Sequence, residues 1–182
     1  MSLLSIEIFI IKLFQLYQPS WLTSIMLFIS LISSIGSYFI IVPIVALFFS
    51  FKNYKTEAFF SIFINLGNIL NPIIKNIAGR SRPNSGLIKI LEEKTSMSFP
   101  SGHAMGAIIF YGFLIYLIWK LPFKHKKIII PLLLLFILLV GISRIYLGAH
   151  WPTDVLAGYV IGFIWLICGI FIYSKFRKVF IR

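Results

Sequence analysis

Long apolar runs dominate this chain, and short polar segments separate them. The four longest runs are long enough for helices that cross a bilayer, which takes about 20 residues. Two shorter runs flank the helix-breaking segment from Ser33 to Ser37. The pattern predicts an all-α, polytopic membrane protein with about six transmembrane helices. We expect these helices at residues 20–34, 37–51, 57–78, 101–120, 128–147 and 152–174.

The segment 3–17 precedes these runs and ends at Gln18-Pro19, where a helix is expected to break. Its mixture of apolar and charged positions predicts an amphipathic helix that lies on the membrane surface. Because 20–34 and 37–51 are shorter than a usual span, a second interpretation stays open, in which 3–17 is the true first span.

Composition supports a membrane protein and excludes some other classes. The chain has 182 residues, of which 59% are hydrophobic, and a mean hydropathy of +0.97. A soluble domain is only about 45–50% apolar. We expect one integral membrane domain, residues 1–182. Cys168 is the only cysteine, so no internal disulfide can form.

The formal net charge is +12, but a nucleic-acid partner is not expected. No basic helix stands apart from the apolar runs, and basic residues beside membrane segments are typical of cytoplasmic loops. In the six-helix arrangement the basic loops and the C-terminal tail share one side, which the positive-inside rule assigns to the cytoplasm. The residues concerned are Lys52, Lys55, Lys120, Lys124, Lys126, Lys127, Lys175, Arg177, Lys178 and Arg182.

Three polar clusters fall on the opposite, extracytoplasmic side. They are the segment 75–83, the segment Pro100-Ser101-Gly102-His103, and a set that contains Ser143-Arg144, His150 and Asp154. Ionisable groups at membrane depth are costly and are usually functional. The clusters therefore predict a site on the outer face of the cytoplasmic membrane.

Ser101-Gly102-His103 is expected to open a helix directly after Pro100. A helix N-terminus offers free backbone N–H groups and a positive dipole end, which favour an anion such as phosphate. Glycine allows close approach of the backbone. The ordinary alternative is a serine N-cap followed by an exposed histidine.

His150 and Asp154 are four residues apart, a spacing that places them on one helical face. The carboxylate can hold Nδ1–H of His150 and leave Nε2 free as a nucleophile. The alternative is a capping aspartate beside an interfacial histidine. The aspartate partner favours His150 over His103 as the nucleophile, although the residues alone do not decide between them.

Lys75, Arg82 and Arg144 are candidate phosphate ligands, because arginine offers two parallel hydrogen bonds and lysine a point charge. Taken alone, each is better explained by snorkelling to the interface. Arg80 is interpreted as an extra cation for lipid headgroups. The coincidence of all three clusters on one face favours the phosphate site over the separate ordinary explanations.

The same residues carry a family resemblance. Lys75 to Pro83 fits the motif K-x6-R-P, Pro100 to His103 fits P-S-G-H, and Ser143 to Asp154 fits S-R-x5-H-x3-D. All three motifs are complete and in order, and the similarity covers about residues 57–160. The chain resembles the type 2 phosphatidic acid phosphatase family.

The resemblance implies a role for each residue. Lys75, Arg82 and Arg144 would bind the phosphoryl oxygens, together with Ser101 and the backbone N–H of Gly102. His150 would attack phosphorus and form a phosphohistidine, with Asp154 orienting it. His103 would protonate the leaving oxygen and then activate water. No cofactor or metal is expected, because the cations and the helix dipole stabilise the phosphoryl charge.

The predicted function is hydrolysis of a membrane lipid phosphate or diphosphate. The candidate substrates are phosphatidylglycerophosphate, undecaprenyl diphosphate, phosphatidate and lipid A 1-phosphate. The loop from Asn84 to Phe99 is too short for a large lid over a soluble substrate. Two alternatives remain, a lipid phosphotransferase and a non-enzymatic anion-binding or anion-conducting membrane protein. The sequence does not determine an oligomeric state.

Overall fold

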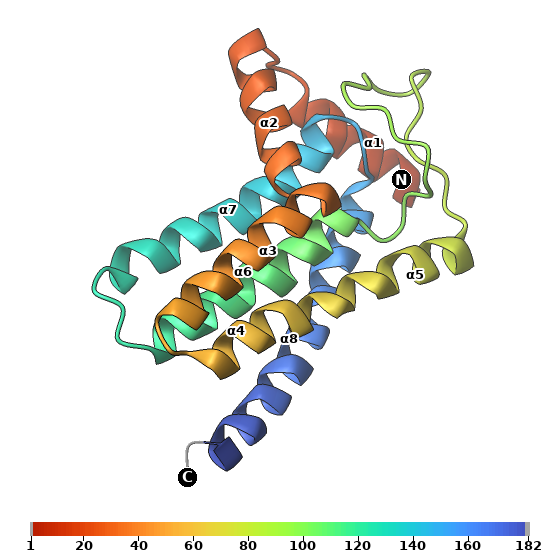
Figure 1. The fold of residues 1–182 in the computed structure, drawn as a ribbon. Helices are drawn as coiled ribbons and strands as arrows, with labels where there is room; N and C mark the ends of the chain where they lie inside the picture. Colours follow the sequence, from red (N-terminus) through yellow and green to blue (C-terminus); the bar gives the residue numbers. More distant parts are fainter. Residues whose placement is uncertain (1, 181–182) are drawn as a thin grey trace.

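The structure is a computed structural model that describes residues 2–180, with side chains described as far as Arg177. Every element in this part of the chain is helical (Figure 1). The predicted basic tail therefore lies partly outside the description: Arg182 is outside the described residues, and the side chain of Lys178 is not described. The helices are α1 (Leu3–Phe14), α2 (Ser20–Ile32), α3 (Ile35–Phe51), α4 (Lys55–Phe63), the 3-10 helix η1 (Ile64–Ile69), α5 (Leu70–Ala78), α6 (Gly102–Lys120), α7 (Lys126–Tyr146) and α8 (Pro152–Phe180).

Four helical segments of the described chain are long and apolar enough to cross a membrane: 55–78, 102–120, 126–146 and 152–177. Helices α2 and α3 pass the same test only together, and they are bent by 61° at their junction. The structure therefore supports four spans, or five if the bent pair is one span. The all-helical, multi-pass prediction is confirmed, whereas the count of six is not.

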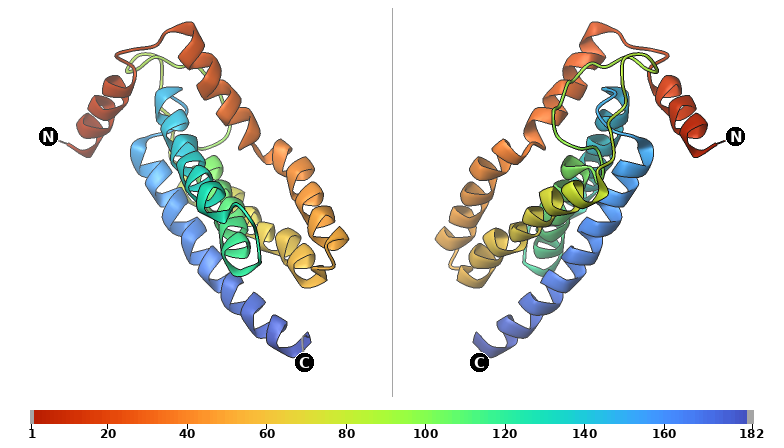
Figure 2. Two further views of the ribbon diagram at one scale, coloured as in Figure 1. Left: turned by 90° about the vertical axis from the view of Figure 1, so that its left-hand side faces the viewer. Right: turned by 90° about the vertical axis from the view of Figure 1, so that its right-hand side faces the viewer.

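Helix α1 is 12 residues long, too short to cross the hydrocarbon core on its own. Most of its outward side chains are apolar, and it lies at the edge of the bundle, where it contacts α7 and α8 (Figure 2). Its position on a membrane surface stays a prediction.

Helix α6 is the centre of the bundle and contacts α3, α4, α7, α8 and η1. A close approach of α8 to α6 depends on Gly158, where a Cβ atom would lie 2.5 Å from the carbonyl oxygen of Ser101. That contact brings the first turns of the two helices together. The two helix starts thus hold the second and third sequence clusters against each other.

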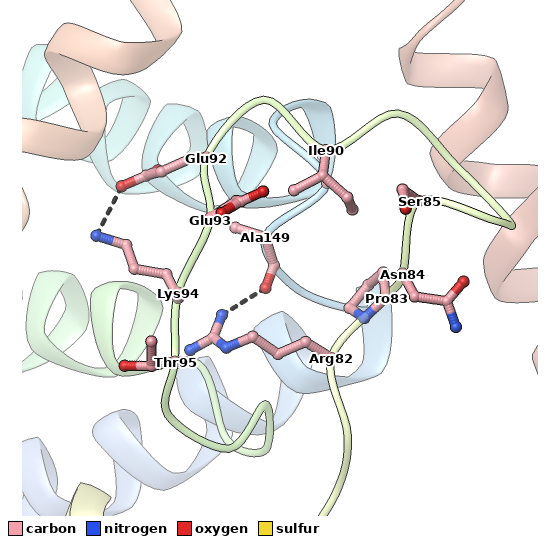
Figure 3. A pocket seen from close by; sticks show the side chains of 11 residues that line it. Arg82, Pro83, Asn84, Ser85, Ile90, Glu92, Glu93, Lys94, Thr95 and Ala149 are labelled. Carbon is pink, nitrogen blue, oxygen red and sulfur yellow. Dashed lines mark hydrogen bonds and ion pairs between the residues drawn. The ribbon is translucent and has the colours of Figure 1, made fainter.

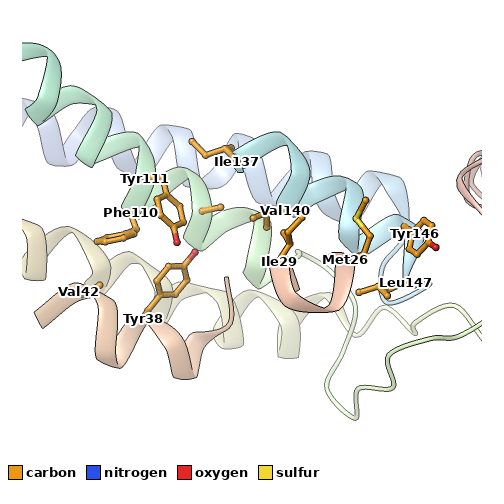
Figure 4. Close-up of a cluster of buried hydrophobic side chains, with 11 residues drawn as sticks. Met26, Ile29, Tyr38, Val42, Phe110, Tyr111, Ile137, Val140, Tyr146 and Leu147 are labelled. Atoms are coloured by element: carbon orange, nitrogen blue, oxygen red, sulfur yellow. The ribbon is translucent and has the colours of Figure 1, made fainter. Parts of the chain in front are cut away.

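Two apolar clusters fill the bundle. One lies between α2, α3, α6 and α7, and Tyr38, Phe110 and Tyr111 form edge-on ring contacts within it (Figure 4). The other joins α3, α4, α6 and α8 around Phe60 and Tyr173. Burial of such large aromatic side chains contributes strongly to the stability of the folded bundle. This rigid frame places the polar clusters at one end.

Candidate active site

The three sequence clusters converge at one end of the bundle, around a cavity of about 220 Å³. Six of the eight predicted site residues line it: Lys75, Arg82, Gly102, His103, Arg144 and His150. The other two, Ser101 and Asp154, are fully buried beside it. The cavity is completed by Ser34, Ile35, Asn71, Lys94, Ser96 and Ala149, none of which is a specified position of the motifs.

Helix α6 begins at Gly102, as predicted, with Ser101 in the N-cap position. The ordinary N-cap explanation fails, because the Ser101 side chain makes no capping hydrogen bond. Its buried Oγ has no hydrogen-bond partner in the described chain. A Cβ atom at residue 102 would lie 2.9 Å from Oδ1 of Asn71, so glycine keeps this face of the helix start open.

His150 lies in the turn before α8 and not on the helix itself, because α8 begins at Pro152. His150 is 2% exposed, and its Nδ1 lies 3.6 Å from Oδ2 of Asp154, beyond hydrogen-bond distance. The predicted direct hydrogen bond is therefore absent in this structure. The Ser98 hydroxyl lies between the two side chains instead, 2.5 Å from Oδ2 of Asp154 and 3.4 Å from Nδ1 of His150.

Arg82 fixes the other side of the imidazole. Its Nη1 lies 3.2 Å from Nε2 of His150 and also donates to the carbonyl oxygen of Ala149. Since arginine can only donate, Nε2 must carry a lone pair and Nδ1 the proton. Burial lowers the pKa of His150 to about 4, and the positive charges of Arg82 and Lys75 act in the same direction.

Lys75 is buried at the end of α5, although it has no carboxylate partner in the described chain. Its Nζ donates to the carbonyl oxygens of Met97 and Ser98, at 2.5 and 3.3 Å. A snorkelling lysine would extend into water, so that explanation does not fit this side chain. The charge is instead directed at the cavity.

Arg144, on α7, is the largest of the fully buried residues in the described chain. Its Nη1 pairs with Oε2 of Glu92 at 2.8 Å, and its Nε donates to the Ser143 hydroxyl. Its Nη2 has no partner in the described part of the chain, and neither has Nε2 of His103. A buried polar atom without a hydrogen-bond partner is costly, so both atoms indicate a ligand.

Glu92 is a site residue that the motifs did not indicate. It lies in the loop between α5 and α6 and also contacts Lys94 and Ser30, at 2.8 and 2.9 Å. Burial acts to raise the pKa of Glu92, but Arg144, Lys94 and the Ser30 hydroxyl outweigh it and hold the pKa below the usual range. Glu92 thus orients Arg144 as a charged partner.

The interpretation of Arg80 as a headgroup cation is wrong. Both terminal nitrogens are paired within the protein, Nη2 with Glu7 and Nη1 with Asp154, each at 2.6 Å. The guanidinium also lies 5.6 Å from the ring centre of Trp151. A local sequence window could not reveal these partners, which are 73 and 74 residues away.

A second, outer cavity of about 450 Å³ adjoins the first and shares Arg82, Lys94 and Ala149 with it (Figure 3). Its walls are mostly the loop between α5 and α6, with Glu92 and Lys94 joined across one side. The loop from Asn84 to Phe99, expected only to be short, is therefore an integral part of the site.

Among the described residues, no group of three or more His, Cys, Asp or Glu side chains could hold a metal ion. The donors at the cavity are cations, hydroxyls and imidazoles, a set suited to an oxyanion. The expectation of metal-independent chemistry stays a prediction.

Fold and cavity together define a helical membrane protein that gathers three cations and two histidines at one end of its bundle. The PAP2 superfamily model matches residues 54–178, and the chain belongs to this family. The resemblance inferred from the three motifs is thus confirmed.

Relatives and solved structures agree with this assignment. The chain is 34% identical to phosphatidylglycerophosphatase B of Bacillus subtilis over 155 residues, 81% of this chain and 73% of that protein. It is 31% identical to an undecaprenyl-diphosphatase of Sulfolobus acidocaldarius over 162 residues, 87% and 73% of the two chains.

The crystal structure of a PAP2 type phosphatidylglycerolphosphate phosphatase from Bacillus subtilis has a TM-score of 0.80 at 29% identity and covers 96% of this chain and 85% of its own. Aquifex aeolicus LpxE shares the fold, with a TM-score of 0.69 at 24% identity over 88% and 92% of the two chains. The prediction of a membrane-embedded phosphatase of this type is confirmed.

Proposed function

We propose that this chain hydrolyses the phosphate monoester or diphosphate of a membrane lipid through a phosphohistidine at His150. One observation carries the proposal. Ser101 Oγ, His103 Nε2 and Arg144 Nη2 are buried atoms without hydrogen-bond partners in the described chain; His103 and Arg144 line the same cavity as His150, and Ser101 precedes Gly102, which also lines it. A phosphoryl group would satisfy all three at once.

His150 is prepared as the nucleophile by its neighbours. The Arg82 donor assigns the lone pair to Nε2, and the pKa of about 4 keeps the ring unprotonated at neutral pH. Ser98 and Asp154 lie on the Nδ1 side, where positive charge develops when Nε2 attacks. The carboxylate stabilises that charge, as a carboxylate beside an imidazole does in other nucleophilic sites.

The first step forms a bond between Nε2 of His150 and the terminal phosphorus and breaks the bond from that phosphorus to the leaving oxygen. The leaving oxygen is the lipid oxygen in a monoester and the bridging oxygen in a diphosphate. His103, protonated, gives its proton to the leaving oxygen. Water then attacks phosphorus, loses a proton to His103, and the P–N bond breaks to release inorganic phosphate. Lys75, Arg82 and Arg144, with Ser101 and the backbone N–H of Gly102, bind the phosphoryl oxygens throughout.

A lipid is the favoured substrate class because of where the cavity lies. It reaches Ser34 and Ile35 at the bend between α2 and α3, and Ile35 is 54% exposed on the apolar surface of the bundle. A lipid tail can leave there into the bilayer while the phosphate stays at the histidines. The names of the relatives favour phosphatidylglycerophosphate and undecaprenyl diphosphate over phosphatidate and lipid A 1-phosphate.

The substrate test measures inorganic phosphate released by the purified protein in detergent from these four lipids, with and without EDTA. We expect release to persist in EDTA and to be inhibited by vanadate, which resembles the in-line transition state. Transfer of the phosphoryl group to a second lipid, without free phosphate, would indicate the phosphotransferase. Loss of activity in EDTA that Mg²⁺ restores would contradict the metal-independent site.

The intermediate can be trapped with His103→Ala. An aryl phosphate leaves without a general acid, so the first step should proceed while water attack is slowed. We expect radioactive phosphate to accumulate on His150 and to be absent in His103→Ala/His150→Ala. The matched control is His125→Ala, which removes an exposed histidine from the opposite end of the bundle. Equal labelling of the double variant would exclude His150 as the phosphorylated residue.

We also propose that the site faces outward from the cytoplasmic membrane, because more exposed lysines lie at the opposite end than at the cavity end. In a Cys168→Ser background, a cysteine at Ser85 should react with an impermeant thiol reagent added to intact cells. A cysteine at Lys127 should react only after the cells are opened. The reverse pattern would place the site in the cytoplasm.

A further inference from the structure

Helix α1 brings a buried acid to the active-site end. Glu7 is 2% exposed, while Leu3, Phe9 and Leu13 on the same helix are more than half exposed. Ile11 is fully buried against Trp151, in the turn before α8. A buried carboxylate is costly unless it is paired, so Glu7 must be held by specific partners.

Those partners connect α1 to Asp154. Oε2 of Glu7 pairs with Nη2 of Arg80 at 2.6 Å, and Oε1 accepts from the Thr153 hydroxyl at 2.5 Å. The same hydroxyl accepts from Nη1 of Arg80 at 2.7 Å. Nη1 also pairs with Oδ1 of Asp154 at 2.6 Å. Arg80 therefore bridges two carboxylates, one on α1 and one beside His150.

Both oxygens of Asp154 are thereby fixed. Oδ1 is held by Arg80, while Oδ2 accepts from the Ser98 hydroxyl and from the backbone N–H of Trp151, at 2.5 and 3.0 Å. Neither Glu7 nor Arg80 lines the cavity, so they can act on His150 only through Asp154. We propose that Glu7 and Arg80 are positioning residues, by which α1 fixes the orientation and the local charge of Asp154 under His150. This inference rests on the proposed function of His150.

The charges give the proposal a signature that a purely structural contact lacks. Glu7, Arg80 and Asp154 together carry a net charge of −1 beside His150. Arg80→Gln makes it −2, and Glu7→Gln makes it zero. The other groups that face His150 are Arg82 and Lys75, with His103 and Arg144 across the cavity, and they are the same in every variant.

The test compares Arg80→Gln, Arg80→Lys, Glu7→Gln and the double variant Glu7→Gln/Arg80→Gln with the wild type, using 4-nitrophenyl phosphate and phosphatidylglycerophosphate. Arg80→Gln should lower kcat by about 10- to 100-fold, with little change in KM, because an orienting contact is lost and no ligand contact is. In Arg80→Gln the fall of kcat/KM at low pH, called here the acid limb, should move to higher pH by about one unit. The extra negative charge favours protonated His150 and so raises its pKa. Glu7→Gln should move the limb down, and the double variant should return it toward the wild type. Arg80→Lys should keep the limb and recover part of kcat.

The matched control is Glu57→Gln, which neutralises a buried, arginine-paired acid at the other end of the bundle. It should lower thermal stability without moving kcat or the acid limb. If Arg80→Gln and Glu7→Gln behave in the same way, the network is only a structural support and the proposal is overturned.

Histidine NMR titration of the same variants, with His150 assigned by its absence in His150→Ala, separates this inference from the proposed function. Opposite shifts in the pKa of His150 in Arg80→Gln and Glu7→Gln support the coupling even if no lipid phosphate is hydrolysed. An unchanged pKa in both folded variants overturns the coupling even if hydrolysis is confirmed.

Discussion

The two ends of the bundle are both basic, yet they use their cations differently. At the end opposite the cavity, Lys52, Lys55, Lys120, Lys124 and Lys127 are exposed. The cavity end also has exposed lysines, Lys12, Lys89 and Lys94, but Lys75 and Arg144 there are buried, and Arg144 keeps a donor without a partner in the described chain. Exposed lysines are explained by the lipid–water interface, whereas buried cations need a ligand or a partner. Burial, and not the number of charges, therefore separates a topology signal from a site.

The buried acids at the two ends also differ in what they contact. Glu57, at the far end, accepts from the Tyr173 hydroxyl at 2.7 Å and pairs with Arg177 at 3.2 Å, joining α4 to α8. Asp154, at the cavity end, has comparable partners but also lies 3.6 Å from an imidazole that faces a cavity. We expect the first acid to contribute stability alone and the second to contribute catalysis as well.

The largest expected difference is between the two histidines at opposite ends. His150→Ala should lower phosphate release on the order of 10⁴-fold or more, because it removes the nucleophile. His125→Ala should leave the rate unchanged, because this exposed side chain lies far from the cavity. Initial rates on phosphatidylglycerophosphate measure both. Near wild-type activity in His150→Ala would refute the mechanism.

A smaller difference is expected between two cations. Arg144→Gln should lower kcat/KM by about 10²- to 10³-fold, as loss of one preorganised donor to a transition-state oxygen does. Arg144→Lys should recover only part of this, because lysine lacks the fork that contacts Glu92 and the phosphate together. Lys127→Gln is the control at the far end and should have no effect. Equal behaviour of Arg144→Gln and Lys127→Gln would remove Arg144 from the site.

The pH dependence tests burial directly. Burial lowers the pKa of His150 to about 4, so kcat/KM should fall only as the pH drops below about 4. Lys75→Met should move this limb to higher pH, because it removes a cation that lowers the pKa. The free energy of unfolding should also fall as the pH drops from about 6.5 to about 4. In this range the histidine binds a proton in the unfolded chain but not in the folded protein. A limb near pH 6.5 in the wild type would mean that His150 is solvated during catalysis.

The fold was predictable where the apolar runs are long. The predicted helices 57–78, 101–120, 128–147 and 152–174 correspond to Lys55–Ala78, Gly102–Lys120, Lys126–Tyr146 and Pro152–Phe180. The sequence also located the break between α2 and α3, within its helix-breaking segment from Ser33 to Ser37. It could not establish whether two short helices form one bent span or two, because this depends on how they pack.

The site was predictable only as far as its motifs extend. Spacing identified the residues that surround the cavity, because each cluster lies at the end of a predicted helix. It did not reveal Glu92 beside Arg144, Ser98 beside Asp154, or Arg80 between two acids. These contacts join segments that are 52 to 74 residues apart, and no local period encodes them.

The smallest and most specific contrast removes one hydroxyl from each buried acid. Ser98→Ala deletes the donor to Asp154, and Tyr173→Phe deletes the donor to Glu57. Each loses one hydrogen bond to a charged group, worth about 1–3 kcal/mol, so thermal unfolding should shift down by a few degrees in both. Only Ser98→Ala should also lower kcat, by about tenfold, because the hydroxyl that lies between the Asp154 carboxylate and Nδ1 of His150 is lost. Melting curves and initial rates on the same preparations make the comparison. A tenfold loss of kcat in Tyr173→Phe, or none in Ser98→Ala, would show that the two ends do not divide stability and catalysis as their geometry indicates.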